Sequence, residues 1–295
     1  MAAKILVTGA AGTVGSQLVK ELVGRGIQVR AAVYSIESAK FLQHDLTEIV
    51  PFDFKDSMTF NRALDGIEKV YLISPETNDH LALVKNFIDV AATAGVHVIK
   101  QSRYGAENQE ILFARWHREA ELYIENTVAE YTFIRPNDYM QNFIYGYPPA
   151  GGVIYLPMGH GVISYIDARD IANTVAEILI QAQEHVKKSY TLTGPGAVSV
   201  ADIANAFSDA SGVHVSYVDI PDETARHALE TGGTPAWLID ALLEMHGRSR
   251  DNYASWVTTD VESLTQRPPK GITQFAQDYA EEIRQLTQQA HPQNV

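Results

Sequence analysis

The chain has no cysteine among its 295 residues, which excludes disulfides, thiolate metal sites and a cysteine nucleophile. Its hydrophobic content of 45% is typical of a globular protein with a sizeable core, whereas a formal net charge of −13 disfavours nucleic acid as a partner. The sequence has no apolar run of about 18 residues and no secretory leader, so we expect no membrane span and a cytoplasmic location. Its ten histidines show no metal-ligand spacing, so no metal site is expected.

A glycine-rich turn near the N-terminus organises the first half of the chain. Gly9, Gly12 and Gly15 follow an apolar run at residues 5–7 and open an amphipathic helical pattern. Gly9 suits a left-handed turn, Gly12 lets a diphosphate approach the backbone, and Gly15 allows the helix to pack closely on the strand. Because a helix N-terminus also offers free N–H groups and a partial positive charge, this turn predicts dinucleotide binding. The residues expected at the pyrophosphate are Gly9, Ala11, Gly12, Thr13, Val14 and Gly15.

Strand-like and helical patterns alternate through this half of the chain, which predicts a parallel sheet with helices on both faces. The expected strands are residues 4–8, 28–33, 48–52, 69–74, 96–102 and 131–135. The expected helices are residues 14–23, 56–64, 80–94 and 111–126. We therefore predict an α/β fold, a doubly wound parallel Rossmann sheet with a smaller C-terminal substrate-binding part.

The pattern becomes irregular after about residue 150, where Pro148 and Pro149 precede two glycines. We assign residues 1–145 and 161–190 to the dinucleotide-binding domain. Residues 146–160 and 191–295 form the smaller substrate-binding part in this division.

The end of the second strand bears on the choice between NAD and NADP. An acidic residue there binds the ribose of NAD and repels the 2′-phosphate of NADP. Here Tyr34 and Ser35 are neutral, the usual basic partner of the phosphate is also missing, and Lys40 is the nearest cation. We therefore expect NADP, with a slight preference over NAD.

Residues at the ends of the later strands complete the predicted cofactor site, because ligands bind at the carboxyl ends of strands in such sheets. Asp53 and Phe54 offer a carboxylate and an aromatic edge to the adenine, and Ser74 borders the nicotinamide ribose. Together with Tyr34 and Ser35 at the end of the second strand, the cofactor residues predicted at the strand ends are Asp53, Phe54, Ile73, Ser74, Pro75, Ser102 and Pro136.

Further motifs, together with the glycine turn, carry a resemblance to a known family. They are Asp53, the run Tyr-Thr-Phe-Ile-Arg-Pro at residues 131–136 with Met-Gln-Asn behind it, and Tyr-Ile-Asp-Ala-Arg-Asp-Ile-Ala at residues 165–172. In combination they resemble the NmrA-like branch of the extended and atypical short-chain dehydrogenase/reductase superfamily. That branch includes triphenylmethane and quinone reductases, isoflavone-reductase-like enzymes and redox-sensing regulators.

The chain departs from the superfamily at the catalytic position. Members with the full dehydrogenase apparatus carry Tyr-x-x-x-Lys-x-x-x-Glu on the helix before the Tyr-Thr-x-Ile-Arg-Pro strand, with the tyrosine as proton donor. The matched spacing places Phe113, His117 and Glu121 at these positions, and none of the fourteen tyrosines has a lysine four residues later. The sequence therefore argues against alcohol dehydrogenation through a tyrosinate and against sugar epimerisation.

His117 and Tyr104 are the candidate catalytic residues. NmrA-like reductases are similar in carrying His-x-x-x-Glu on this helix, so His117 is expected in the cofactor pocket, where contact with the nicotinamide ribose is favoured over acid catalysis. The alternative is a surface histidine paired with Glu121. Tyr104, in the loop after the fifth strand, is a candidate proton donor or a wall of the acceptor pocket, and alternatively an exposed loop tyrosine.

Residues after the sixth strand are expected to border the acceptor, although Met140 and Phe143 also suit a core at helical spacing. The predicted substrate residues are Tyr104, Asn137, Tyr139, Met140 and Phe143. The predicted function is an NAD(P)H-dependent reductase that delivers hydride to a small, planar, electrophilic acceptor such as a quinone, an enone or a cationic dye. Such acceptors need no tyrosine acid at the moment of transfer, so positioning carries most of the catalysis. The alternative is a non-enzymatic, dinucleotide-binding redox sensor that acts through a protein partner; a homodimer is compatible with either.

Overall fold

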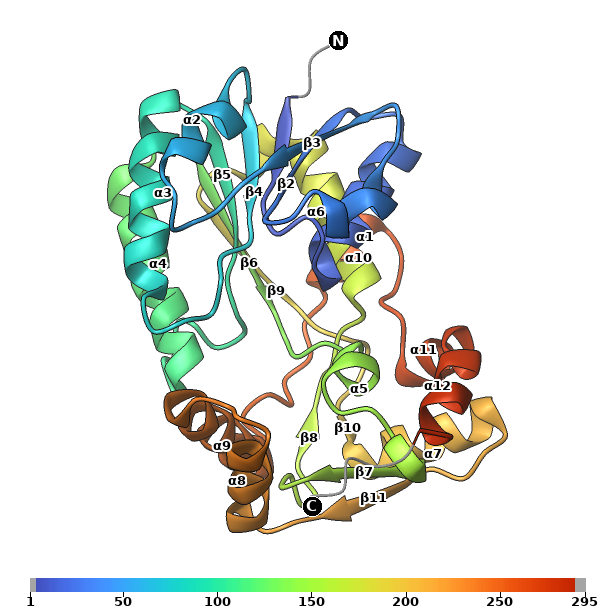
Figure 1. The fold of residues 1–295 in the computed structure, drawn as a ribbon. Coiled ribbons are helices and arrows are strands. Elements are labelled where there is room, and N and C mark those ends of the chain that lie inside the picture. Colours follow the sequence, from blue (N-terminus) through green and yellow to red (C-terminus); the bar gives the residue numbers. More distant parts are fainter. Residues whose placement is uncertain (1–3, 290–295) are drawn as a thin grey trace.

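A seven-stranded parallel sheet forms the larger part of the protein, whose computed structural model describes residues 4–289 (Figure 1). The strand order is β3-β2-β1-β4-β5-β6-β9, with every neighbouring pair parallel. The strands are β1 (Ile5–Val7), β2 (Val29–Val33), β3 (Thr47–Pro51), β4 (Lys69–Leu72), β5 (His97–Gln101), β6 (Tyr131–Pro136) and β9 (Lys188–Leu192). The order reverses between β1 and β4, which is the point where such sheets bind dinucleotides. The predicted fold class is confirmed.

Helices cover both faces of this sheet and bury a separate apolar cluster on each (Figure 1). One face carries α1 (Thr13–Gly24), α6 (Ala168–Ile180) and α10 (Asp260–Thr265). The opposite face carries α2 (Met58–Leu64), α3 (His80–Ala94) and α4 (Leu112–Thr127). Because both faces are covered, the central strands β1, β2, β4 and β5 are buried along nearly their whole length.

Local sequence signals explain where the principal helices begin and end. The Asp167 carboxylate accepts a hydrogen bond from the Arg169 N–H at 2.8 Å and caps α6. Gly95 ends α3 in a left-handed conformation with φ of 66°. Two polar residues of β5 are buried in the sheet, His97 and Lys100, and the Lys100 side chain is fully buried.

The smaller part lies at the carboxyl ends of the strands and has its own core (Figure 1). β7 (Val153–Leu156) pairs in parallel with β11 (Ser216–Asp219), and β8 (Val162–Ile163) pairs antiparallel with β10 (Val198–Ser199). The helices around them are α5 (Asn142–Tyr145), α7 (Val200–Ser211), α8 (Asp222–Thr231), α9 (Ala236–Arg250), α11 (Ile272–Asp278) and α12 (Ala280–Thr287). The short 3₁₀ helices are η1 (Glu37–Leu42), η2 (Ala150–Gly152) and η3 (Ala182–His185). This separate core supports the proposed division into two parts, which stays a proposal.

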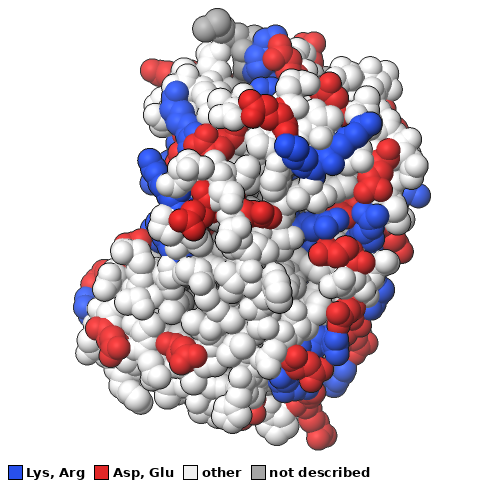
Figure 2. Space-filling model, turned by 180° about the vertical axis from the view of Figure 1, so that it is seen from behind, with Lys and Arg blue, Asp and Glu red and all other residues white. Residues whose placement is uncertain are grey.

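Lys and Arg lie among Asp and Glu over the sheet part on the face seen in Figure 2, and much of the lower half of that face has no charged residue. Between residues 4 and 289, none of the helices combines the length and apolar character needed to cross a membrane.

Candidate functional site

A groove of about 570 Å³ follows the carboxyl ends of β1, β2, β3 and β4. It is the site expected for the dinucleotide, since it crosses the point where the strand order reverses. The predicted cofactor residues that line it are Gly9, Ala11, Gly12, Tyr34, Asp53, Phe54, Ile73, Ser74 and Pro75. Thr13, Val14, Gly15 and Ser35 do not line this groove.

The glycine turn has the geometry that a bound diphosphate requires. Gly9 has φ of 58°, and the Gly12 N–H donates to its carbonyl oxygen at 2.9 Å. A Cβ at Gly15 would lie 2.2 Å from the same oxygen, so only glycine lets α1 start this close to the turn. A Cβ at Gly12 would have that oxygen as its nearest neighbour, at 3.2 Å, and would otherwise point into the groove. The first N–H groups of α1, including those of Thr13 and Val14, have no intrahelical acceptor and suit the phosphate oxygens.

The adenosine end of the groove is neutral at β2. Tyr34 is 84% exposed and forms part of the wall. The Ser35 hydroxyl accepts a hydrogen bond from the Ser38 N–H at 3.3 Å. Lys40 pairs with Glu37 at 2.5 Å, so its charge is already partnered.

A second cavity, of about 270 Å³, meets the groove at Ile73 and Ser74, which line both. The other predicted residues that line it are Ser102, His117, Pro136, Asn137 and Tyr139. The Ser74 Oγ is buried without a partner among the described residues, as expected of a group that awaits a ligand. Sequence reasoning missed the wall residues Glu76, Gln101, Arg103 and Asp138.

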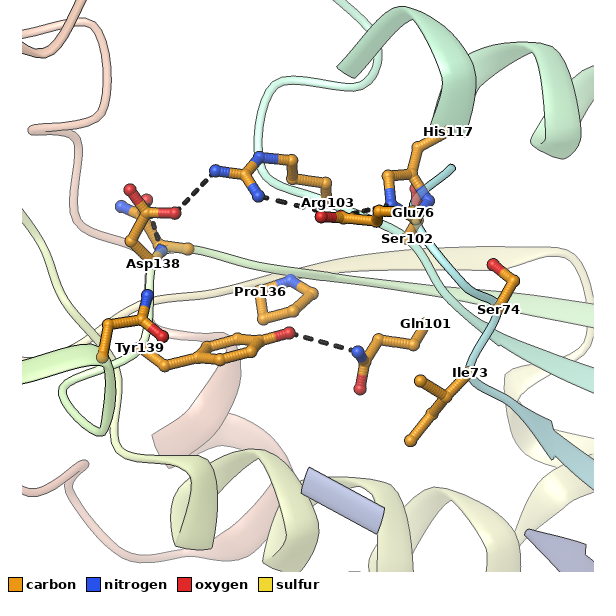
Figure 3. A pocket seen from close by; sticks show the side chains of 12 residues that line it. Ile73, Ser74, Glu76, Gln101, Ser102, Arg103, His117, Pro136, Asp138 and Tyr139 are labelled. Atoms are coloured by element: carbon orange, nitrogen blue, oxygen red, sulfur yellow. Dashed lines mark hydrogen bonds and ion pairs between the residues drawn. The ribbon is translucent and has the colours of Figure 1, made fainter. Parts of the chain in front are cut away.

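Arg103 is the cationic side chain in the wall of this second cavity (Figure 3). Its guanidinium lies between two carboxylates, 2.6 Å from Asp138 and 3.9 Å from Glu76. It also lies over the ring of Phe113, 5.5 Å from the centroid. Phe113, which the sequence match predicts at the superfamily's tyrosine position, is therefore a buried platform for this arginine.

His117 projects from α4 into a chain of hydrogen bonds. Its side chain is 6% exposed, its Nδ1 lies 3.2 Å from Lys100 Nζ, and its Nε2 lies 3.2 Å from Glu76 Oε1. The alternative of a surface histidine paired with Glu121 is therefore wrong. Lys100 also donates to the carbonyl oxygen of Gln101.

The pKa values of this cluster agree with one direction of hydrogen bonding. Burial lowers the pKa of Lys100 to about 7, against the attraction of nearby carboxylates. Burial, and after it the charge of Lys100, lowers the pKa of His117 to about 4. Partial loss of solvation raises the pKa of the Glu76 carboxyl, but the hydrogen bond from His117 and the charge of Arg103 outweigh it and bring the value to about 2. At neutral pH, Lys100 thus donates to Nδ1 of a neutral imidazole, whose Nε2–H donates to the Glu76 carboxylate.

Glu121, one turn after His117 on α4, holds neighbouring elements together through hydrogen bonds. Its fully buried carboxylate accepts hydrogen bonds from the Ser102 hydroxyl at 2.7 Å and from Arg135 at 2.9 and 2.8 Å. Arg118 on its own helix donates to it as well, at 2.9 Å. This network ties α4 to the ends of β5 and β6, and it holds the Ser102 hydroxyl toward Glu121.

A second hydrogen-bond chain ends at Tyr139. The Tyr71 hydroxyl donates to Gln101 Oε1 at 2.8 Å, and Gln101 Nε2 donates to the Tyr139 hydroxyl at 3.1 Å (Figure 3). Burial raises the pKa of Tyr139 far above its ordinary value, so the phenol keeps its proton. The Tyr139 oxygen accepts the bond from Gln101, so the phenol proton can be donated to an oxygen of a molecule bound in the cavity.

The remaining predicted substrate residues face the smaller part. The Asn137 amide donates to the Ser164 hydroxyl at 2.8 Å, although the residue also lines the cavity. Met140 and Phe143 belong to the core of the smaller part, which confirms the core alternative. Tyr104 does not line this cavity, and its half-buried ring packs edge-on against Tyr253.

The chain belongs to the NmrA-like family. The model of that family matches residues 1–260. Over 281 residues the chain is 33% identical to the NAD(P)H azoreductase of Xenophilus azovorans. The aligned region covers 94% of this chain and 98% of that protein. The structure of an NADPH-dependent quinone oxidoreductase from Escherichia coli, complexed with NADPH, has a TM-score of 0.82 at 25% identity and covers 93% of this chain and 99% of its own.

The triphenylmethane reductase of a Citrobacter species has the same fold, with a TM-score of 0.82 at 23% identity over 94% of this chain and 99% of that chain. The predicted family, the oxidoreductase class and a nicotinamide dinucleotide as cofactor are confirmed by these comparisons. Within residues 4–289, His, Asp and Glu side chains form no cluster of three or more that is arranged to hold a metal ion.

Proposed function

We propose that this protein is an NAD(P)H-dependent reductase that transfers hydride to a planar electrophilic acceptor, a quinone, an enone or a cationic dye, without a tyrosine–lysine pair. The observation that carries the proposal is the meeting of the two cavities at Ile73 and Ser74, one shaped for a dinucleotide and one lined by polar groups. When bound, the dinucleotide supplies the hydride at this junction.

The residues of the chain have separate tasks in this proposal. The turn at Gly9 and Gly12 binds the diphosphate, the unpartnered Ser74 hydroxyl binds the nicotinamide end, and His117 borders the nicotinamide ribose. Tyr139 donates a hydrogen bond to an oxygen of the acceptor. A volume of about 270 Å³ lies just below the usual range for ligand sites, so it encloses one or two rings of the acceptor.

NADP is the slightly preferred cofactor in this proposal. The neutral strand end at Tyr34 and Ser35 places no carboxylate beside a 2′-phosphate, and the hydroxyls of Ser35 and Ser38 each bond to the backbone of the other residue there. The absence of a free cation at this strand end keeps the preference small, because Lys40 is paired with Glu37 in the described structure. The cytoplasmic location and the homodimer stay predictions from the sequence.

The test follows oxidation of NADPH and of NADH by the purified protein in the presence of a quinone, a cyclic enone or a cationic triarylmethane dye. Steady oxidation that depends on the acceptor supports the reductase. Cofactor binding without turnover of any acceptor contradicts it and favours the redox sensor. Because His117 lines the cavity, His117→Ala should weaken cofactor binding and lower turnover, whereas normal values of both would return His117 to a purely structural role.

A further inference from the structure

Lys100 is an unusual residue for the middle of a buried parallel strand. Its side chain is fully buried, and its described hydrogen-bond partners are the Gln101 carbonyl oxygen and His117 Nδ1. Neither partner is a carboxylate, so the charge of a protonated Lys100 has no direct ion pair in the described structure. A buried amine of this kind loses its proton easily, which is a property that sites of proton transfer use.

The amine is connected to the acceptor cavity through one side chain. His117 accepts from Lys100 at Nδ1 and donates from Nε2 to Glu76, with 3.2 Å between the heavy atoms at each step. His117 and Glu76 both line the cavity, whereas Lys100 does not. A neutral imidazole in this arrangement takes up a proton at one nitrogen as it releases a proton from the other.

We propose that Lys100 stores the proton needed to complete reduction and that His117 passes it into the acceptor cavity. This inference rests on the proposed reductase function and narrows its substrate class. It applies to acceptors that become localised anions when they take up hydride, such as enones.

The transfer balances for an enone. Hydride forms a C–H bond at the β-carbon, and the π electrons of the alkene move toward the carbonyl oxygen. The resulting enolate takes the proton from His117 Nε2, while Nδ1 takes a proton from Lys100, which is left as a neutral amine. After the product leaves, solvent returns a proton by the reverse path, because the Glu76 side chain at its outer end is 41% exposed.

Every charged or titratable group that faces the imidazole fits this assignment. Glu76 follows β4 and is an anion, and Arg103 follows β5 and is held between carboxylates. His80 on α3 lies 5.0 Å from the His117 ring, and burial lowers its pKa to about 3, so it stays neutral. Glu121 on α4 is occupied by Ser102 and two arginines. Of these groups Lys100 is the one whose pKa, about 7, lies near neutrality.

The experiment compares two acceptors in the same enzyme, 2-cyclohexen-1-one and a cationic triarylmethane dye. The dye becomes neutral when it takes up hydride and needs no proton. Lys100→Met should lower kcat for the enone about 100-fold and leave dye turnover within about two-fold, because Lys100 does not line the cavity. His117→Gln also removes the contact with the cofactor, so it should lower both activities, and kcat for the enone about ten-fold more than kcat for the dye. Glutamine retains an acceptor for Lys100 and a donor for Glu76 but carries no proton between them. Lys69→Met is the matched control, because Lys69 starts β4 and its Nζ donates to Leu179, away from the cavity.

The pH profile and the histidine ring give readouts that a purely structural role would not move. Wild-type kcat for the enone should fall as pH rises through the pKa of Lys100, and Lys100→Met should lose that limb. Without cofactor, ¹⁵N NMR should show His117 protonated at Nε2 and accepting at Nδ1, with a changed Nδ1 signal in Lys100→Met. The His117→Gln variant assigns that signal by its disappearance.

The outcomes separate the two proposals. If wild type reduces neither of these acceptors nor a quinone, the reductase function fails and this inference fails with it. If wild type reduces the dye or a quinone but not the enone, or if Lys100→Met loses enone and dye reduction in parallel, the relay is overturned and the reductase stands. Unchanged enone reduction in either variant also overturns the relay.

Discussion

Replacing Lys100 with methionine should stabilise the folded protein at neutral and lower pH, although the change removes the bonds from Lys100 to His117 and Gln101. Burial lowers the pKa of Lys100 from 10.5 to about 7. At about 1.4 kcal/mol per pKa unit, this shift corresponds to a cost of about 5 kcal/mol when the amine must be charged in the fold. Methionine is apolar and of similar length, so it removes this cost and leaves only a small change in packing.

The sign of the pH dependence follows from proton binding. Above the folded pKa and below the unfolded pKa, the unfolded chain binds a proton on Lys100 that the folded protein does not, so wild-type stability rises with pH. The Lys100→Met variant lacks this gain. Its advantage over wild type should therefore shrink by about 2 to 3 kcal/mol between about pH 7 and about pH 9. His117, with a pKa of about 4, stays neutral throughout this window and does not contribute.

Urea denaturation of the cofactor-free protein, followed by circular dichroism across this pH window, measures the effect as a difference of unfolding free energies. Lys69→Met again serves as the control for loss of a lysine from the sheet. If the difference between wild type and Lys100→Met is the same at both ends of the window, Lys100 is charged in the fold and the reasoning is refuted. A destabilised variant at neutral pH would show that the lost hydrogen bonds outweigh the burial of charge.

Other predictions concern the cofactor groove. Gly12→Ala should fold normally but bind NADPH more weakly, because its Cβ points into the groove. Gly15→Ala should instead lower the unfolding free energy by about 1 to 3 kcal/mol, because its Cβ meets the Gly9 oxygen. Thermal melts and cofactor titration by fluorescence distinguish the two variants, and the same change in stability and affinity in both would contradict these separate roles of the two glycines. Ser35→Arg should favour NADPH over NADH by offering the 2′-phosphate a charged planar donor. Unchanged dissociation constants would show that this strand end does not meet the ribose.

The order of elements and the cofactor groove were predictable because their signals are local. Alternating apolar runs identified the strands from β1 to β6, and the spacing of Gly9, Gly12 and Gly15 identified the turn that α1 follows. The place of β9 beside β6 was not predictable, since it depends on pairing between strands far apart in the chain.

The acceptor cavity was harder to predict because its walls come from loops without a motif. Glu76, Arg103 and Asp138 follow three different strands, and only the fold brings their charges together. Lys100 had a signal that the sequence analysis did not use, a lysine directly after the apolar pair Val98 and Ile99 in a predicted strand. The positions of Met140 and Phe143 suit residues that border an acceptor and also residues of a helix core, so the sequence left both interpretations open. In the structure both side chains are buried in the core of the smaller part.

The arrangement around His117 changes what the cavity can accept. The sequence match predicts His117 at the helix position of the superfamily's lysine, whereas the buried amine of this chain comes from β5 and contacts the imidazole at Nδ1. The wall of the cavity therefore carries a neutral ring and the Glu76 carboxylate instead of an ammonium group. A cationic acceptor meets no uncompensated positive charge there, because Arg103 is flanked by carboxylates. In the proposed relay, an acceptor that needs a proton receives one through the imidazole, which connects the cavity to the buried amine. On that proposal, a single site would serve both kinds of acceptor.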